Sequence, residues 1–323
     1  MGLILKVRMS IHLSGMLRGT DMQKVLVIAG PTASGKSGFA IECAKKFNGE
    51  IISGDSIQIY RGLNIGSAKI KEDEKQGIIH HLIDIKNADE AYSVKEFQQL
   101  GREIIDDLSK KRKLPIVAGG TGLYIKALLY DYTFFDEEVK DDPYDELSNQ
   151  EIYDILSKED PESLKKIHVN NRKRLVRALN VLRKHGQGIS EIAAKQEHKP
   201  LYDTLIIGLN KDRDILYRDI NLRVDQMFEE GLLDEVKSLV DKGINFDMQS
   251  MQGIGYREFR AYFDGTLSLD EVREMIKKDT RNFAKRQLTW FNNQMDVHWY
   301  DITDDEYESK LMSDLCAWME DEK

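Results

Sequence analysis

The chain has 323 residues, of which 41% are hydrophobic and 32% charged, and its formal net charge at pH 7 is −9. This balance is typical of a globular protein with a substantial core, and it argues against a disordered chain or a uniformly basic nucleic-acid binder. No apolar run is long enough to cross a bilayer, so no membrane partner is expected. The two cysteines, Cys43 and Cys316, lack metal-ligand spacing, which favours reduced thiols in a cytoplasmic protein.

The first elements in chain order predict a phosphate site. Residues 1–23 carry no signal-peptide pattern, and we expect them to be a disordered N-terminal extension. Residues 24–29 predict a strand, and the spacing G-x-x-x-x-G-K-S follows before a helix near 36–47. Glycines let the backbone N–H groups of such a loop point at one anion, Lys36 adds charge, and Ser37 can hold Mg²⁺. The predicted ligands of a di- or triphosphate with Mg²⁺ as cofactor are Gly30, Pro31, Thr32, Ala33, Ser34, Gly35, Lys36 and Ser37.

A second predicted strand, near 50–53, ends at Asp55. This carboxylate would face the bound phosphates as a metal ligand, as a general base on an acceptor, or as a simple loop cap. Polar side chains follow it at Ser56, Gln58 and Tyr60, and their hydrogen-bonding groups suit the edges of a base.

A third strand is predicted at 114–118, after a helix that Ser93 and Glu96 open as a capping box. A typical P-loop hydrolase has an acidic residue after such a strand, but this chain has Gly-Gly-Thr-Gly at 119–122. That sequence predicts a second anion nest with the Thr121 hydroxyl, although a plain tight turn is the alternative. Two anion loops without a hydrolytic aspartate favour a diphosphate that is held as a leaving group.

Residues 134–200 are polar, helical in pattern and free of predicted strands. Within them, residues 165–185 contain eight Lys or Arg residues and no Asp or Glu. A basic run is often a solvated face, but a run of this length without acids favours contact with an RNA backbone.

The sequence after 200 returns to the sheet with a strand near 205–209 and then a helix capped by Asp212. Arg223 falls within the apolar stripe of that helix, so its guanidinium needs either a structural carboxylate or the phosphate of a ligand. The last predicted helix, from about 270 to 290, carries Lys277, Arg281 and Lys285 at intervals of four residues.

Together these elements predict an α/β fold, a P-loop NTPase-like parallel sheet flanked by helices, with an inserted all-helical domain. The catalytic core would comprise 24–133 and 201–300, the helical insertion with the basic run 134–200, and an acidic C-terminal tail 301–323. The three loops after the strands would open onto one edge of the sheet.

The combined motifs resemble the tRNA dimethylallyltransferase, or tRNA isopentenyltransferase, family of bacterial type. The resemblance covers residue 24 to about residue 300, and its elements occur in family order at 30–37, 53–60, 65–69, 81–84, 119–124, 253–257 and 285–290. Small departures are Ser67, Ile70 and Gly253, where the family usually has Thr, Pro and Ala.

The resemblance implies transfer of a dimethylallyl group from dimethylallyl diphosphate to N6 of the adenine immediately 3′ of the tRNA anticodon. It implies that Asp55 accepts the N6 proton and that Thr121 and Arg223 contact the diphosphate. We expect a monomer that grips the anticodon stem-loop. The implied tRNA contacts are Asp55, Ser56, Ile57, Gln58, Lys173, Arg174, Leu175, Val176, Arg177, Gly253, Ile254, Gly255, Tyr256, Arg257, Lys285, Arg286, Gln287 and Trp290.

Three other functions are compatible with parts of the pattern. A P-loop kinase would use the same loop, with Asp55 as base on an acceptor hydroxyl, but it leaves the basic insertion unexplained. A non-catalytic RNA-binding switch would leave Asp55 without a role. A prenyltransferase acting on free adenine nucleotides would not need the basic segment 165–185. The family is often described as ATP-binding, but the implied reaction gives ATP no role.

Overall fold

The fold is known from a computed structural model, which describes residues 22–132, 134, 142–194 and 198–321. Within these residues six parallel strands form one sheet in the order β3–β2–β4–β1–β5–β6. The central strand β1 pairs with β4 on one side and with β5 on the other. The strands are β1 (Lys24–Ala29), β2 (Gly49–Ser53), β3 (His80–His81), β4 (Leu114–Gly119), β5 (Asp203–Asn210) and β6 (His298–Asp301). The predicted parallel α/β sheet is confirmed.

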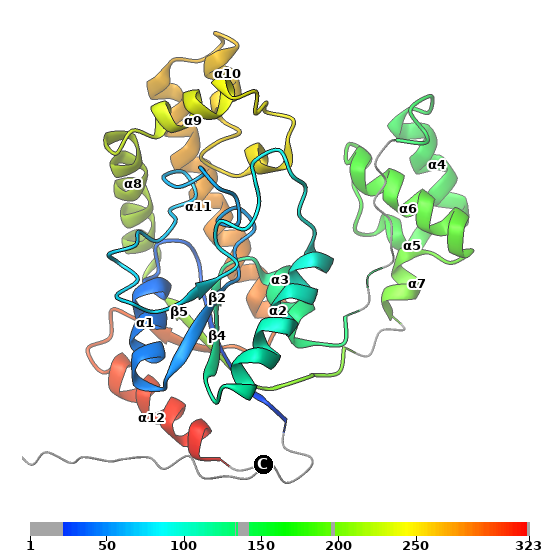
Figure 1. Ribbon diagram of the computed structural model, residues 1–323. Coiled ribbons are helices and arrows are strands. Elements are labelled where there is room, and N and C mark those ends of the chain that lie inside the picture. Colours follow the sequence, from blue (N-terminus) through cyan, green and yellow to red (C-terminus); the bar gives the residue numbers. More distant parts are fainter. Residues whose placement is uncertain (1–21, 133, 135–141, 195–197, 322–323) are drawn as a thin grey trace, which may run out of the picture.

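Helices cover both faces of the sheet (Figure 1). On one face α1 (Lys36–Lys46) packs against the strands through Phe39 and Ile41. The other face is covered by a larger apolar cluster that unites the remaining core helices. These are α2 (Val94–Lys110), α3 (Gly122–Leu129), α8 (Arg213–Glu229), α9 (Leu232–Asp241), η1 (Gln249–Gln252), α10 (Phe259–Phe263) and α11 (Leu269–Gln294).

The C-terminal segment differs from the acidic tail that the sequence suggested for 301–323. Strand β6 adds to the edge of the sheet beside β5, and α12 (Tyr307–Glu320) then packs beside α1. Leu311 and Leu315 of α12 are fully buried, four residues apart on one helical face. The acidic residues described in this segment are exposed to solvent. In the sequence they are interspersed with the apolar residues, so the apolar stripe of the helix was not recognised.

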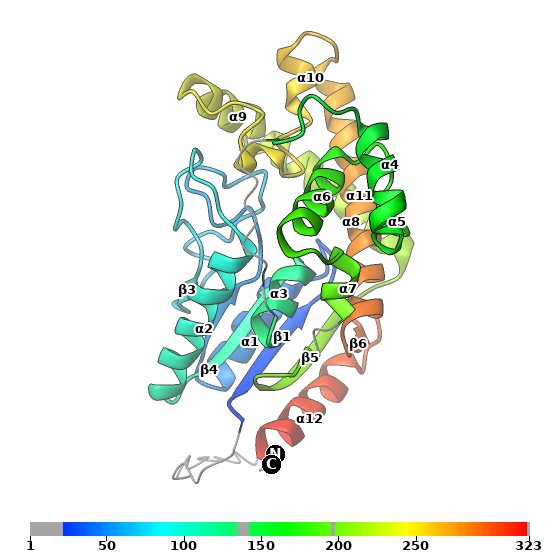
Figure 2. The same ribbon diagram turned by 90° about the vertical axis from the view of Figure 1, so that its right-hand side faces the viewer.

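The helices of the insertion form a lobe of their own, which stands apart from the core on the side of α2 and α3 (Figures 1 and 2). It comprises α4 (Asn149–Glu159), α5 (Pro161–Leu164), α6 (Arg172–His185) and α7 (Ile189–Ala194), around a separate apolar cluster. At the start of α6, Arg172 donates hydrogen bonds to the Asp142 carboxylate and to the Tyr144 and Leu147 carbonyls, and so links α6 to the segment before α4. Residues 1–21, and part of the acidic stretch before the lobe, lie outside the described residues.

Among the described residues no helix is both long and apolar enough to span a membrane.

Candidate active site

The phosphate-binding loop lies between the buried strand β1 and the start of α1, at the carboxyl edge of the sheet. At Gly30 the backbone has φ of 147°, and an added Cβ would come within 2.4 Å of the Leu209 carbonyl oxygen, so only glycine fits. Ala33 adopts a left-handed conformation, φ 63°, which costs an alanine about 1 kcal/mol. Strain of this kind persists where the surrounding structure fixes a functional loop.

Lys36 opens α1, and its ammonium donates a hydrogen bond to the Pro31 carbonyl. Burial, with a further contribution from the positive charge of Arg223, lowers the pKa of Lys36 to about 7, while Asp55 opposes the shift. Three of the predicted site residues therefore lie close enough to influence one another electrostatically, although they come from β1–α1, β2 and α8.

The depressed pKa gives a prediction for anion binding. In the free protein Lys36 loses its proton as the pH rises through about 7, whereas a bound diphosphate would stabilise the protonated amine. Inorganic diphosphate should therefore bind at pH 8 with uptake of about one proton, and its affinity should fall as the pH rises above 7. Calorimetry in buffers of different ionisation enthalpy measures the uptake. Lys36→Met should abolish it, and equal uptake in both proteins would contradict the prediction.

Arg223 projects from α8 toward the same place. Burial lowers its pKa, and the carboxylates of Glu74, Asp55 and Glu230 act in the opposite direction. Nevertheless its guanidinium makes no hydrogen bond or ion pair with any described residue. Of the two partners that the sequence left open, a structural carboxylate is thus not found in the described chain, which favours a ligand phosphate.

Asp55 follows β2 at the same edge. Its Oδ1 accepts hydrogen bonds from the backbone N–H groups of Ile57 (2.8 Å) and Gln58 (3.2 Å). The carboxylate therefore caps its own loop while its charge acts on Lys36 and Arg223. The Ser56 hydroxyl makes no hydrogen bond with a described residue.

The amide of Gln58 is already engaged within its own loop. It accepts a hydrogen bond from the Ser53 hydroxyl and donates to the backbone carbonyls of Ser67 and Ala68. These bonds stabilise the loop. The amide could therefore hydrogen-bond to a base only if it first gave up its bonds to Ser53, Ser67 and Ala68.

The second anion loop lies beside the first, because β4 is the direct neighbour of β1. Thr121 is the N-cap of α3, but its hydroxyl makes no capping bond and is free for a ligand among the described residues. Its backbone N–H donates to the Gly54 carbonyl (3.2 Å), which joins this loop to the one that carries Asp55.

Several predicted RNA contacts are buried instead. Tyr256 is 0% exposed, and its hydroxyl donates to Glu235 at 2.7 Å. Gly253 packs against Ile57, which itself lies partly buried against the core. Arg257 pairs with Glu258 and Asp279. Gly253, Gly255 and Tyr256 are therefore buried against the loop after β2, which corrects their expected role as an RNA surface. Arg257 is exposed and Ile254 half-buried, so their contact with RNA stays a prediction.

Glu235 of α9 is a supporting residue that the sequence did not reveal. Its carboxylate accepts hydrogen bonds from three successive backbone N–H groups, those of Asn64, Ile65 and Gly66, as well as from Tyr256. This clamp orders the chain that Gln58 contacts. An isolated glutamate on an amphipathic helix gives no sequence signal for such a role.

The basic surface of the helical lobe is only partly as predicted. Lys173, Arg174 and Arg177 are exposed on α6 and make no ion pair with other described residues. By contrast Leu175 and Val176 are 0% and 5% exposed and belong to the core of the lobe, so they cannot face RNA as expected. The helical period separates the two groups onto opposite faces.

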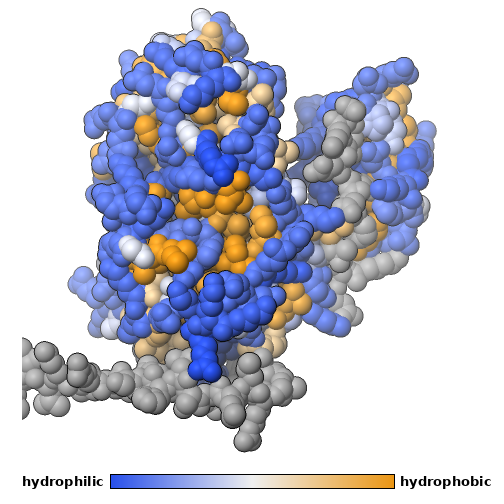
Figure 3. All heavy atoms as spheres, in the orientation of Figure 1, coloured by the Kyte–Doolittle hydropathy of each residue, from blue (hydrophilic) through white to orange (hydrophobic). Residues whose placement is uncertain are grey.

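The basic residues of α11 also fall into two groups, one that contacts α8 and one that is exposed. Lys277 pairs with Asp225 at 2.8 Å and Arg281 donates to Asn221, so both bind α11 to α8. Further along, Lys285 and Arg286 are exposed, and with Trp290 they line a surface pocket of about 490 Å³. The Trp290 indole packs directly over Gly122, one residue after Thr121. Figure 3 shows a hollow between the core and the helical lobe.

Gln287 of α11 does not line that pocket. Its side chain is 7% exposed and bonded to both anion loops, to the Thr32 N–H and to the Gly120 carbonyl. It was expected to contact RNA, and its burial excludes that in this conformation.

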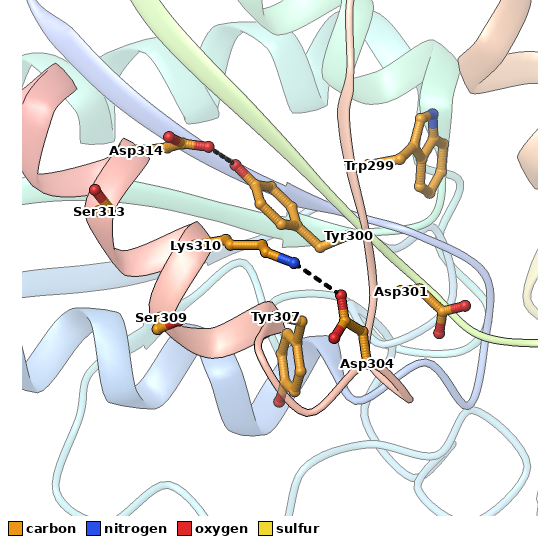
Figure 4. A pocket seen from close by; sticks show the side chains of 9 residues that line it. All are labelled: Trp299, Tyr300, Asp301, Asp304, Tyr307, Ser309, Lys310, Ser313 and Asp314. Atoms are coloured by element: carbon orange, nitrogen blue, oxygen red, sulfur yellow. Dashed lines mark hydrogen bonds and ion pairs between the residues drawn. The ribbon is translucent and has the colours of Figure 1, made fainter.

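A larger surface pocket, of about 630 Å³, lies between β6 and α12 (Figure 4). No residue of the two anion loops lines it. Its polar groups satisfy one another, because Lys310 pairs with Asp304 and the Tyr300 hydroxyl donates to Asp314. Its position and these pairs set it apart from the candidate active site.

The residues present fit a Mg²⁺ ion that is bound mainly by its substrate. Among the described residues no group of three or more His, Cys, Asp or Glu could hold a metal. Ser37 is exposed in the first turn of α1, and its hydroxyl is a hard oxygen donor. Mg²⁺ characteristically takes one or two protein ligands together with phosphate oxygens and water.

Comparisons with known proteins point to one family. The family described as IPP transferase matches residues 58–294. A tRNA dimethylallyltransferase of Geobacillus thermodenitrificans is 50% identical over 292 residues, or 88% of this chain and 92% of its relative. One of Anoxybacillus flavithermus is 46% identical over 301 residues, covering 92% and 96%.

Solved structures show the same likeness. The full-length tRNA isopentenylpyrophosphate transferase of Bacillus halodurans is 42% identical, with a TM-score of 0.72, over 92% of this chain and 97% of that one. A eukaryotic dimethylallyltransferase acting on tRNA is 29% identical, with a TM-score of 0.78, over 91% and 80%. The chain therefore belongs to the IPP transferase family.

Proposed function

We propose that this protein transfers a dimethylallyl group from dimethylallyl diphosphate to N6 of the adenine immediately 3′ of the anticodon in tRNA. The products are N6-(dimethylallyl)adenosine and diphosphate. The observation that carries the proposal is the convergence of Lys36, Arg223 and Asp55 beside two anion loops, in a chain whose relatives are named for this reaction.

The chemistry divides between a leaving group and a base. The N6 lone pair attacks C1 of the dimethylallyl group as the bond from C1 to the diphosphate oxygen breaks, so negative charge grows on the diphosphate. Lys36, Arg223 and the loop amides stabilise that charge, and the Thr121 hydroxyl donates to it. Mg²⁺ held at Ser37 would supply further charge neutralisation. Asp55 accepts the proton that N6 loses.

The adenine reaches the site by leaving its stack, which costs a few kcal/mol and is easiest in a single-stranded loop. Ser56 would meet the edge of the base, and Gln58 would do so after its hydrogen bonds exchange. Lys173, Arg174 and Arg177 on the lobe, with Lys285, Arg286 and Trp290 on α11, would hold the anticodon stem-loop from both sides of the hollow.

The P-loop kinase gains no support from the comparisons. Strand β4 ends at Gly119 and is followed by Gly120 and Thr121, and none of these gives a carboxylate to orient a metal-bound nucleoside triphosphate. The monomeric state and the cytoplasmic location stay predictions.

The deciding experiment is a transfer assay with radiolabelled dimethylallyl diphosphate, Mg²⁺ and unmodified tRNA with adenine 3′ of its anticodon. Label should appear in that tRNA and not in one with another base at this position, nor in free adenine nucleotides. A parallel reaction replaces the diphosphate with γ-labelled ATP. Phosphate transfer from ATP without prenyl transfer would overturn the proposal.

The lobe gives a prediction of its own. Changing Lys173, Arg174 and Arg177 together to Ala should weaken tRNA binding and reduce the slope of log Kd against log salt by about two to three, roughly one per lost phosphate contact. Affinity for inorganic diphosphate should not change, because the cations lie on a separate lobe. Filter binding at several salt concentrations measures both quantities.

The matched control removes the same charge at Lys45, Lys46 and Lys110, which are exposed at the ends of α1 and α2 away from the site. Equal losses in the two triple variants would mean that only net charge matters, and would contradict a specific RNA surface on α6.

A further inference from the structure

Gln287 lies between the two anion loops and is bonded to both. Its Oε1 accepts a hydrogen bond from the Thr32 N–H at 3.1 Å, and its Nε2 donates to the Gly120 carbonyl at 3.0 Å. An added Cβ at Gly120 would lie 2.0 Å from that nitrogen, so the glycine leaves the space that the amide fills. The two bonds use the two ends of one planar, buried group.

Among the described residues no other side chain is hydrogen-bonded to both of these loops. Their strands are adjacent, but the pairing of β1 with β4 ends with Ala29 opposite Gly119. The sheet therefore fixes the start of both loops, and Gln287 fixes their separation where the anion would sit. The rigid amide has opposite hydrogen-bonding character at its ends, matching one N–H and one carbonyl.

We propose that Gln287 is a positioning residue for the diphosphate, which sets the spacing of the two anion loops from α11. This inference rests on the proposed function and deepens it. It reassigns to the leaving-group site a buried residue that we expected from the sequence to contact tRNA. The amide touches neither substrate, and it acts through the Thr32 and Gly120 backbones.

The test separates the two substrates by their binding. Gln287→Met keeps the length of the side chain but removes both hydrogen bonds. We expect affinity for inorganic diphosphate and kcat/KM for dimethylallyl diphosphate to fall by about 10–10²-fold, since a misplacement of about 1 Å is enough for such a loss. The affinity for tRNA in the absence of diphosphate should stay within twofold of the wild type. Gln99→Met, at an exposed position of α2, is the matched control and should change nothing.

A second variant tests the hydrogen bonds themselves. In Gln287→Glu the ionised carboxylate still accepts from Thr32 but repels the Gly120 carbonyl, whereas the protonated acid can donate to it. Burial raises the pKa of such a carboxyl, so diphosphate affinity relative to the wild type should recover as the pH falls from 8 to 6. The diphosphate affinity of Gln287→Met relative to the wild type should not depend on pH over the same range. Lys36, Asp55 and Arg223 are present in all three proteins, so their titration cancels to first order in the ratio.

Weaker tRNA binding with unchanged diphosphate affinity would make Gln287 an RNA contact and overturn the inference. So would unchanged binding of both, or a Gln287→Glu ratio that does not depend on pH. Binding of inorganic diphosphate does not require transfer, so a wild-type protein that binds it but modifies no tRNA would refute the proposed function alone.

Discussion

Replacing Asp55 with Asn is expected to slow dimethylallyl transfer by about 10²–10⁴-fold, the usual contribution of a positioned general base. Asparagine retains a side-chain oxygen that accepts from the Ile57 and Gln58 N–H groups, so the loop keeps its shape. It cannot, however, take up the N6 proton. The single-turnover rate with saturating tRNA and dimethylallyl diphosphate is the quantity to measure.

Substrate binding separates this role from a structural one. Asp55 holds the pKa of Lys36 up, so its loss lowers that pKa further and weakens diphosphate binding at neutral pH. Binding is therefore best compared near pH 6, where Lys36 stays protonated in the wild type, and there it should be nearly equal in the two proteins. Asp89→Asn, at an exposed position, is the control. An unaffected rate would assign the base to another group, and lost tRNA binding at pH 6 would make Asp55 a contact.

The parts of the site that could be predicted are those whose chemistry is local in sequence. The phosphate loop needs glycine at Gly30 and a helix start at Lys36, and both are visible in eight consecutive residues. The loops that carry Asp55 and Thr121 follow predicted strands, and parallel pairing then brings them to one edge. Arg223 was visible because a cation inside an apolar stripe is out of place.

The parts that could not be predicted depend on where a side chain points after folding. Lys277 and Lys285 belong to one stripe in the sequence, yet the first pairs with Asp225 and the second is exposed. Gln287 stands between Arg286 and Leu288 in a basic segment, but the turn of the helix buries it. Tyr256 and Glu235 are hydrogen-bonded although they are 21 residues apart in the sequence, and no local pattern predicts such a contact. Motif membership therefore identified the segment, and packing decided which side chains face a ligand.

Arg223→Met is expected to reduce diphosphate affinity and kcat/KM for dimethylallyl diphosphate by about 10²–10³-fold, comparable to removing one charge-stabilising donor. The same change should leave the melting temperature unchanged or raise it. A half-buried guanidinium with no hydrogen bond or ion pair among the described residues costs folding free energy, and methionine fills the same space without that cost. Thermal unfolding without ligand and calorimetric titration of diphosphate measure the two effects.

Opposite changes in stability and in binding are the signature of a residue kept for its ligand. Arg218→Met, on the exposed side of the same helix, should alter neither by much. A second signature comes through Lys36, whose pKa Arg223 lowers. Without Arg223 that pKa rises, so diphosphate binding at pH 8 should take up fewer protons than in the wild type. If Arg223→Met instead lowers the melting temperature strongly while the proton uptake stays the same, the guanidinium supports the fold, and the charge that stabilises the leaving group comes from Lys36 and the loop amides alone.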